Sequence, residues 1–472
     1  MSMRRKLALV VLGMGLLIGS PYRADAQSLA DALVAAYRNS DLLEQNRALL
    51  RATDEDVVQA QAALRPVVNF ITGTNANWRR ITAAGVTTNE SSLSLNFSLV
   101  AEMTLFDFGR SQLGVAFARE QVLSARAGLV SVEQQVLLGA VQAFLGVVRA
   151  RDEVALRRSN LELIREELRA ARQRFELGDS TRTDIAIAEA RLAAAESMLA
   201  AAEGDFAVAR EEYRLATGSY PNRMSQPPAL PRLPSSMNSA MSMARRNHPA
   251  IAQAQHQVAA ADLMVESARA ARRGAVRGEV SAGIVGRSGD PANSLTRDLS
   301  AGIRYSVPLY QGGRLTSDER QAVARREAQR ADLNRQVAQI MQSVGSNWAQ
   351  LEVARARLAA SRQQIEAAET AYEAVRAEAE LGSRTSLDVL NAEQELLDAR
   401  SARIGASAGL QLAAYALLES TGQLTVEALN LGIPTYDVEA YGASLRNAGR
   451  VRVQPSEQGQ RLDRILERYG HD

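Results

Sequence analysis

Several residue types are scarce in this 472-residue chain, and each scarcity excludes a class of function. There is no cysteine, which excludes disulfides, thiolate catalysis, cysteine-ligated metals and a lipid anchor on an N-terminal cysteine. The only lysine is Lys6, so the rest of the chain lacks the lysine that a phosphate-binding loop or a Schiff base requires. Histidines number three and aromatic residues make up 4%, whereas alanine is abundant.

The first 26 residues have the pattern of a secretory signal peptide. Arg4, Arg5 and Lys6 precede an apolar stretch over 7–19, and small residues at 24–26 form a cleavage site before Gln27. The apolar stretch is too short to span a bilayer comfortably, which favours cleavage over a membrane anchor. Because this leader carries four positive charges and one negative, its removal changes the net charge from +2 to −1. Nucleic-acid binding therefore has no support.

Beyond the leader we find no apolar run long enough to be a transmembrane helix. An exported protein can still cross an outer membrane with β-strands.

Two similar turns lie 204 positions apart, at residues 177–184 and 381–388. In each, a glycine stands just past the end of a helical pattern, where it can take the left-handed conformation. A threonine followed three residues later by an aspartate then predicts a capping box at the start of the next helix. Each turn is therefore expected to fold a long helix back on another. The equivalent residues are Leu177, Gly178, Thr181 and Asp184 in the first turn, and Leu381, Gly382, Thr385 and Asp388 in the second.

The helices that these turns join are expected to be very long. Apolar residues recur at three- and four-residue steps over 110–177 without a proline, which is typical of a coiled-coil helix about 100 Å long. A return helix is expected over 183–217. Two shorter helices, over 29–38 and 41–64, precede them.

Strand patterns separate the short helices from the long ones. The period changes to two over 67–82 and 91–106, around a loop at 83–90. A second pair of strands is expected over 276–286 and 295–309. In the clearest strand, the residues that share an apolar face are Leu93, Leu95, Phe97, Leu99, Ala101, Met103 and Leu105.

The order of these elements occurs twice, which predicts an internal twofold repeat. Equivalent residues are 204 positions apart across both long hairpins, as expected for helices that pack side by side and need equal lengths. The expected organisation is a signal peptide at 1–26, a first repeat at 27–218, a proline-rich linker at 219–235, a second repeat at 236–422, and an equatorial segment with a flexible tail at 423–472.

Four strands of about eleven residues can cross a bilayer when tilted, but they cannot close a barrel alone. An open sheet edge in lipid would leave backbone groups unpaired, so membrane-spanning strands would require oligomerisation. Two other interpretations are a soluble periplasmic hairpin and an ordinary exported coiled coil. The paired strands, the export signal and the repeated tips favour the membrane barrel.

With these features the chain resembles the TolC family of outer membrane channels, from about Leu29 to Tyr441. The repeat, the two Leu-Gly-x-x-Thr-x-x-Asp tips and the strand-to-helix joint at 308–313 carry the resemblance. It implies an α+β membrane protein in the outer membrane. In the implied homotrimer, a 12-stranded β-barrel in lipid continues into a periplasmic barrel of long antiparallel helical hairpins.

The resemblance also implies partners and a role. Members of the family are exit ducts for efflux pumps and type I secretion systems. They join an inner-membrane ABC or proton-driven transporter through a periplasmic adaptor, and they need no cofactor or metal. The residues that the resemblance places at the adaptor contact are Leu177, Gly178, Thr181, Leu381, Gly382 and Thr385.

The same resemblance implies a periplasmic gate at the tips. Three copies of Asp388 would meet near the axis, where like charges attract cations. Arg384 would tie to Asp184 and hold the duct closed. Asn391 replaces a second acid found in some members, so the negative ring should be weaker here. The plainer alternative is that Asp184 and Asp388 serve only as capping residues.

No catalytic constellation is evident, so an enzyme is not expected. His248 and His256 are eight residues apart, and they are expected to be solvated or packed rather than zinc ligands. Glu166 and Glu167 are expected on a solvated helix face. The alternative of a different class is an exported trimeric coiled-coil structural or adhesin protein. Efflux of small molecules and secretion of proteins are not separated by the sequence.

Overall fold

The structure is a computed structural model that describes residues 26–178, 181–289, 293–381 and 383–447. The expected signal peptide up to residue 25, Gly382 and the expected flexible tail lie outside these residues. Near the start of the described chain, Gln27 forms a short parallel bridge with Met224 in the proline-rich linker.

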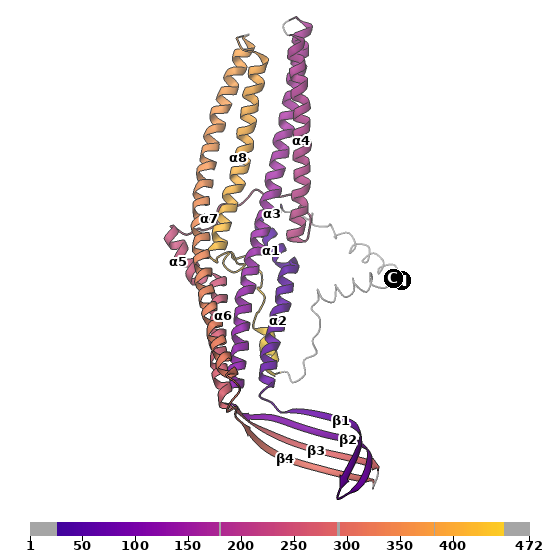
Figure 1. Cartoon of the computed structure of the whole chain (residues 1–472). Helices are drawn as coiled ribbons and strands as arrows, with labels where there is room; N and C mark the ends of the chain where they lie inside the picture. The colour runs from indigo at the N-terminus through magenta and orange to yellow at the C-terminus, as the bar shows by residue number, and fades with distance from the viewer. Residues whose placement is uncertain (1–25, 179–180, 290–292, 382, 448–472) are drawn as a thin grey trace, which may run out of the picture. The chain divides into compact units, whose positions relative to one another are not determined.

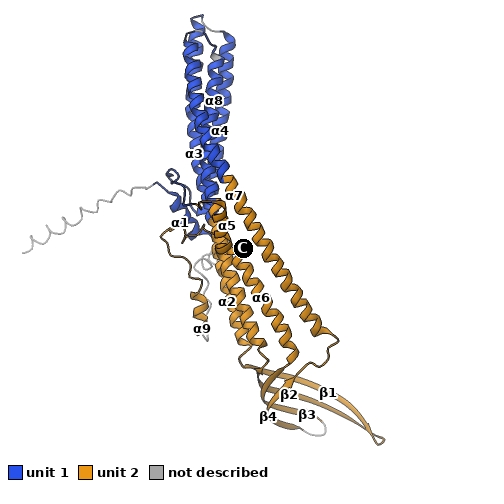
Figure 2. Cartoon of the chain, turned by 90° about the vertical axis from the view of Figure 1, so that its left-hand side faces the viewer, with its two compact units in different colours: residues 1–40, 137–232, 351–415 blue, residues 41–136, 233–350, 416–472 orange. Residues whose placement is uncertain are grey.

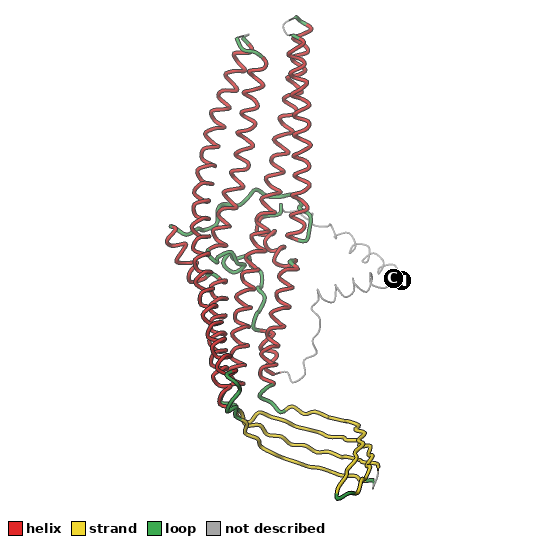
Figure 3. The backbone as a smooth tube through the Cα atoms, in the orientation of Figure 1, coloured by secondary structure: helices red, strands yellow, loops and turns green. Residues whose placement is uncertain are grey.

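The elements follow the order expected from the sequence (Figures 1 and 3). The long helices α3 and α7 have 67 residues each, and the paired short helices α1/α5 and α2/α6 also have equal lengths. The first six elements are α1 (Leu29–Asn39), α2 (Asp41–Ala62), β1 (Val67–Ala83), β2 (Val86–Phe106), α3 (Arg110–Glu176) and α4 (Arg182–Thr217). The others are α5 (Met237–Asn247), α6 (Pro249–Ala270), η1 (Ala271–Arg273), β3 (Ala275–Gly289), β4 (Ser294–Ser306), α7 (Arg314–Glu380), α8 (Ser386–Ser420) and α9 (Ala440–Asn447).

The expected helices of the first half are confirmed to within two residues at each end. Helix α9 was not expected from the sequence. It is eight residues long, and it is held to α2 by a hydrogen bond of 2.7 Å from the Tyr441 hydroxyl to Glu55. A helix this short depends on such tertiary contacts for its stability, and eight residues are too few to show a helical pattern of apolar residues in the sequence.

The chain divides into two compact units, each built from three stretches (Figure 2). One unit comprises residues 1–40, 137–232 and 351–415, and contains both helical turns. The other comprises residues 41–136, 233–350 and 416–472, and contains the β-sheet.

In the unit that contains the turns, α3 and α4 pack as an antiparallel coiled coil. Leu161 and Ile164 of α3 form a buried cluster with Ala195 of α4. The small alanine side chain lets the two helices approach closely, and alanine also has a high helix propensity. The alanines buried on α4 recur every seven residues: Ala188, Ala195, Ala202 and Ala209.

Ion pairs follow the same register along the outside of this coiled coil. Their side chains are about half exposed, so each pair contributes at most about 1 kcal/mol to stability. Their seven-residue spacing on both helices matches the alanine seam and opposes a register slip. The pairs join Arg158 to Glu203 at 2.6 Å, Arg165 to Glu196 at 3.4 Å and Arg172 to Glu189 at 2.7 Å.

In the other unit, the strands form one antiparallel sheet in the order β1-β2-β3-β4. Its register places apolar residues of neighbouring strands on one face, where Leu99 lies opposite both Phe70 and Ala282, and Ala282 lies opposite Leu299. Large apolar side chains on this face are exposed, with Leu299 at 82%. The opposite face is polar.

The hairpin loops differ from the sequence expectation. Residues 86–90 belong to β2, and only Ala84 and Gly85 form the turn, both with positive φ. The polar residues expected in a loop are instead paired across the strands, for example Thr82 with Thr87 at 3.0 Å. Strand β3 also extends to Gly289. Strand β4 ends at Ser306 rather than Leu309, because Pro308 cannot donate to a sheet.

The sequence led us to expect no apolar run beyond the leader that is long enough to be a transmembrane helix, and this expectation was too strict. Helix α3 contains a stretch that is long and apolar enough to cross a membrane by length and composition alone. However, 44% of that stretch is buried inside the protein. A helix that packs against its neighbours can therefore meet the criteria of length and composition without crossing a membrane.

Candidate functional site

The first helical turn has the capping geometry that its sequence predicts. Helix α3 ends before Gly178, which has a φ of 84°. The Asp184 amide donates to the Thr181 hydroxyl at 3.3 Å, and the Thr181 amide donates to the Asp184 carboxylate at 2.9 Å. These two bonds satisfy backbone donors that the start of α4 would otherwise leave free.

The second turn repeats this geometry. Thr385 and Asp388 exchange the same pair of bonds, at 3.0 and 3.2 Å, at the start of α8. Hydrogen bonds from the Thr385 amide and hydroxyl hold the pKa of Asp388 below its usual value. Asp388 therefore remains ionised at any pH near neutral, as a charged ring at this position requires.

Arg384 is the cation of the second turn, and its neighbour in the structure is a residue of α7. Its Nε atom donates to the Glu378 carboxylate at 2.8 Å, an exposed ion pair within one hairpin. This pairing raises the pKa of Arg384. The tie from Arg384 to Asp184 remains a prediction.

Each turn also presents an exposed leucine. Leu177 is 78% exposed and Leu381 is 86% exposed. A single exposed leucine is normal on a protein surface, so the exposure alone does not mark an interface. The structure thus places one apolar side chain at the end of each hairpin.

The two hairpins are joined close to their turns by a polar contact that the sequence did not predict. Arg191 of α4 donates from Nη2 to the Asn391 side-chain oxygen of α8 at 3.0 Å. Asn391 was expected only as a neutral replacement for an acid. Its amide oxygen accepts a hydrogen bond from the neighbouring hairpin.

A buried carboxylate lies beside this contact. Glu393 of α8 is only 6% exposed, and neither of its carboxylate oxygens has a hydrogen-bond partner among the described residues. Burial, and then the nearby Glu167 of α3, raise the pKa of Glu393 to about 7, while Arg191 acts in the opposite direction. The carboxyl group can therefore exchange a proton in the neutral range.

Glu393 was not among the residues expected at the gate, although the sequence contains a signal for it. It stands between Leu390 and Leu397, three and four residues away, and so occupies an apolar seam position of α8. Glu166 is solvated and paired with Arg169 at 2.7 Å, as expected. Glu167 is different, because it is partly buried and lies near Glu393.

The two histidines among the described residues, His248 and His256, each contact a neighbouring group. His248 Nδ1 accepts a hydrogen bond from the Ala250 amide at the start of α6, and burial lowers the pKa of His248. His256 contacts Glu120 at 2.8 Å. Within the described part of the chain, no group of three histidine and acidic side chains could hold a metal ion.

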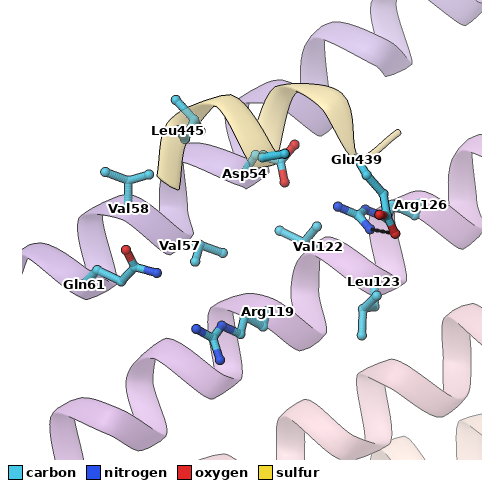
Figure 4. A pocket seen from close by; sticks show the side chains of 12 residues that line it. Asp54, Val57, Val58, Gln61, Arg119, Val122, Leu123, Arg126, Glu439 and Leu445 are labelled. Carbon is cyan, nitrogen blue, oxygen red and sulfur yellow. Dashed lines mark hydrogen bonds and ion pairs between the residues drawn. The ribbon is translucent and has the colours of Figure 1, made fainter. Parts of the chain in front are cut away.

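A groove lies in the unit that contains the sheet, between α2, α3 and α9 (Figure 4). It has a volume of about 490 Å³. Asp54, which is 5% exposed, reaches it next to Gly442, and an ion pair of 3.3 Å joins Arg126 to Glu439 at its edge. Apolar side chains complete the lining: Val57, Val58, Val122, Leu123 and Leu445.

Known proteins share this arrangement of elements. A family described as outer membrane efflux protein matches residues 32–219 and again 240–423. The outer membrane efflux protein BepC of Brucella suis is 34% identical over 428 residues, which cover 89% of this chain and 91% of BepC. The proteases secretion protein PrtF of Dickeya chrysanthemi is 26% identical, with 84% of this chain and 88% of PrtF covered.

A solved structure shows the same fold at lower identity. The outer membrane protein VceC of Vibrio cholerae is 20% identical and superposes with a TM-score of 0.69, over 84% of this chain and 96% of VceC. The chain is therefore a member of the outer membrane efflux protein family, the TolC family of channels, and is located in the outer membrane.

Proposed function

We propose that three copies of this chain form the outer membrane exit duct of a tripartite export system. The duct would pass secreted proteins or small molecules from an inner-membrane transporter, of the ABC or proton-driven type, through a periplasmic adaptor. The main support for this proposal is the four-stranded sheet. It has one apolar face, one polar face, and two edge strands that each pair on one side only within the described residues.

The edges argue for closure between copies. Strand β1 has 17 residues and β4 has 13, and each presents one row of backbone donors and acceptors. Such rows are not tolerated in lipid unless they are paired. Four strands alternate in direction, so β4 of one copy can pair antiparallel with β1 of the next. Three copies would supply twelve strands, which is enough for a closed barrel.

The polar face is compatible with a water-filled interior. Two pairs of like charges lie directly opposite each other on neighbouring strands: Glu102 opposite Glu279, and Arg277 opposite Arg304. Opposed like charges destabilise a sheet. They are tolerated where water screens them, as in the lumen of a membrane barrel.

The gate in this proposal consists of Asp388, Arg384, Asp184 and Asn391. Arg384 is half exposed and its Nε atom is bound to Glu378, so a tie to Asp184 would use its Nη atoms or replace this pair. Exchange between exposed ion pairs costs little free energy. A gate built on such pairs could therefore open when an adaptor binds.

We propose two classes of cargo, small molecules and secreted proteins, and do not choose between them. The name of BepC favours efflux, and the name of PrtF favours secretion of proteins. We propose no covalent catalysis for either role.

Purified protein should form cation-preferring channels in planar bilayers if Asp388 forms a ring. Asp388→Asn keeps an acceptor for Thr385 but removes the charge, so it should lower the cation-to-anion permeability ratio at least about twofold. The reversal potential in a salt gradient measures this ratio. Asp398→Asn, an exposed acid farther along α8 that is hydrogen-bonded to Gln394, is the matched control. Absence of conductance contradicts the duct, and an unaltered reversal potential for Asp388→Asn contradicts the ring.

Arg384→Ala should increase the open fraction of the channel, because the closed tips lose a charged tie. An exposed ion pair is weak, so an increase of only about two- to fivefold is expected. Single-channel recordings provide the measurement. Arg355→Ala removes a comparable pair with Glu352, at 2.8 Å within α7, and should leave gating unchanged. Equal open fractions for the two variants would show that Arg384 does not hold the tips.

Leu177→Asp and Leu381→Asp should abolish adaptor docking, because each puts a charge on an apolar contact. Loss of crosslinking to the adaptor and loss of transport in cells are the expected results. Leu215→Asp is the control, because Leu215 is 89% exposed at the other end of α4. Crosslinking that persists in both tip variants would rule out docking through the leucines.

A further inference from the structure

Glu393 lies where three other helices contribute charged or titratable groups. Glu167 projects from α3, Arg191 from α4, and Tyr372 from α7, followed by Arg376 one turn later. Both hairpins therefore meet at this carboxyl group. Tyr372 is affected as well, since burial and then the charge of Glu393 raise its pKa.

The hydrogen bonding around Glu393 fits the neutral acid better than the anion. An ionised carboxylate prefers several donors, and leaving it buried without them carries a large desolvation cost. Arg191, whose charge favours the ionised form of Glu393, directs its Nη2 atom to Asn391 instead. Glu167 adds repulsion rather than compensation and is itself 3.8 Å from Arg174.

We propose that Glu393 is a proton-sensitive gating residue: the two hairpins pack together when its carboxyl group is protonated and loosen when it is ionised. This inference rests on the proposed function, because it assigns a further residue to the gate. The bond from Arg191 to Asn391 spans the same contact and positions the two hairpins around the acid.

The direction of the pH effect follows from proton linkage. In the packed hairpins the pKa of Glu393 is about 7, and in separated hairpins the exposed group would return toward its usual value of 4.5. The packed form then binds more protons between these values, so packing is strongest below 4.5 and weakens as pH rises to 7. Above 7 it weakens no further. Between pH 8 and pH 5.5 the packing equilibrium should change about 25-fold.

Asp388 does not produce the same effect. Its pKa is lowered by the bonds from Thr385, so its charge is constant over this range. A change in gating between pH 5.5 and pH 8 that depends on Glu393 is therefore distinct from the charged ring.

The experiment measures the hairpin contact directly. Because the chain has no cysteine, Ile187→Cys on α4 and Leu387→Cys on α8 introduce a unique pair for spin labels, at two residues that line the same small hollow. Full-length labelled chain is diluted with unlabelled chain, and distances are recorded at pH 5.5 and pH 8. The expected result is a short, narrow distribution at pH 5.5 and a longer, broader one at pH 8.

Three variants test the role of the Glu393 carboxyl group. Glu393→Gln mimics the protonated form, so the short distribution should persist at both pH values. Glu395→Gln is the control, because Glu395 is an exposed acid on the same helix, and it should behave as the unmodified chain does. Glu167→Gln removes the repulsion and should shift the transition to lower pH, which provides a test even if Glu393→Gln fails to fold.

Single-channel recordings distinguish this inference from the proposed function. If the chain conducts and Arg384→Ala opens it, but Glu393→Gln and Glu167→Gln leave the pH response unchanged, the proton-sensitive contact is wrong and the duct stands. If the chain does not conduct, the duct fails, while the distance measurement still decides whether Glu393 controls the hairpin contact.

Discussion

The two outer edges of the four-stranded sheet, which are unpaired within the described part of the chain, are the constraint on which the rest of the molecule depends. The apolar face of this sheet is suited to lipid, yet β1 and β4 each carry a row of backbone groups that lipid cannot satisfy. The proposed closure by further copies would resolve this conflict and would place the opposed like charges of the polar face in water. Under the proposed function a symmetric ring of chains would satisfy the strands, and the helices that follow them would share its symmetry.

The helices meet this requirement through equal length and fixed register. Helices α3 and α7 have 67 residues each, so the two turns occur at equivalent positions. Within one hairpin, alanines and ion pairs at seven-residue spacing hold α3 against α4. Between the hairpins the contact is more polar, with Arg191 bound to Asn391 beside the buried Glu393. A contact with an unsatisfied carboxyl group is less stable than an alanine seam, which would suit the proposed separation of the hairpins during opening.

Much of this organisation could be predicted from the sequence, because it depends on local signals. Glycine followed by Thr-x-x-Asp determines each turn, and alternation of apolar and polar residues determines the strand faces. The extent of β2 could not be predicted in this way, since Thr87 and Asn89 look like loop residues and are ordered by partners across the hairpin. The partner of Arg384 and the environment of Glu393 also depend on packing between distant segments, which a single sequence does not reveal.

Disulfide crosslinking between edge strands is the decisive test of closure between copies. The chain has no native cysteine, so Thr74→Cys in β1 can be combined in turn with cysteines along residues 295–303 of β4. Closure by three copies predicts covalent dimers and trimers at one register, with no larger species. A ladder that continues beyond three chains, or no crosslinking at any register in the membrane-inserted protein, would contradict a closed ring of three.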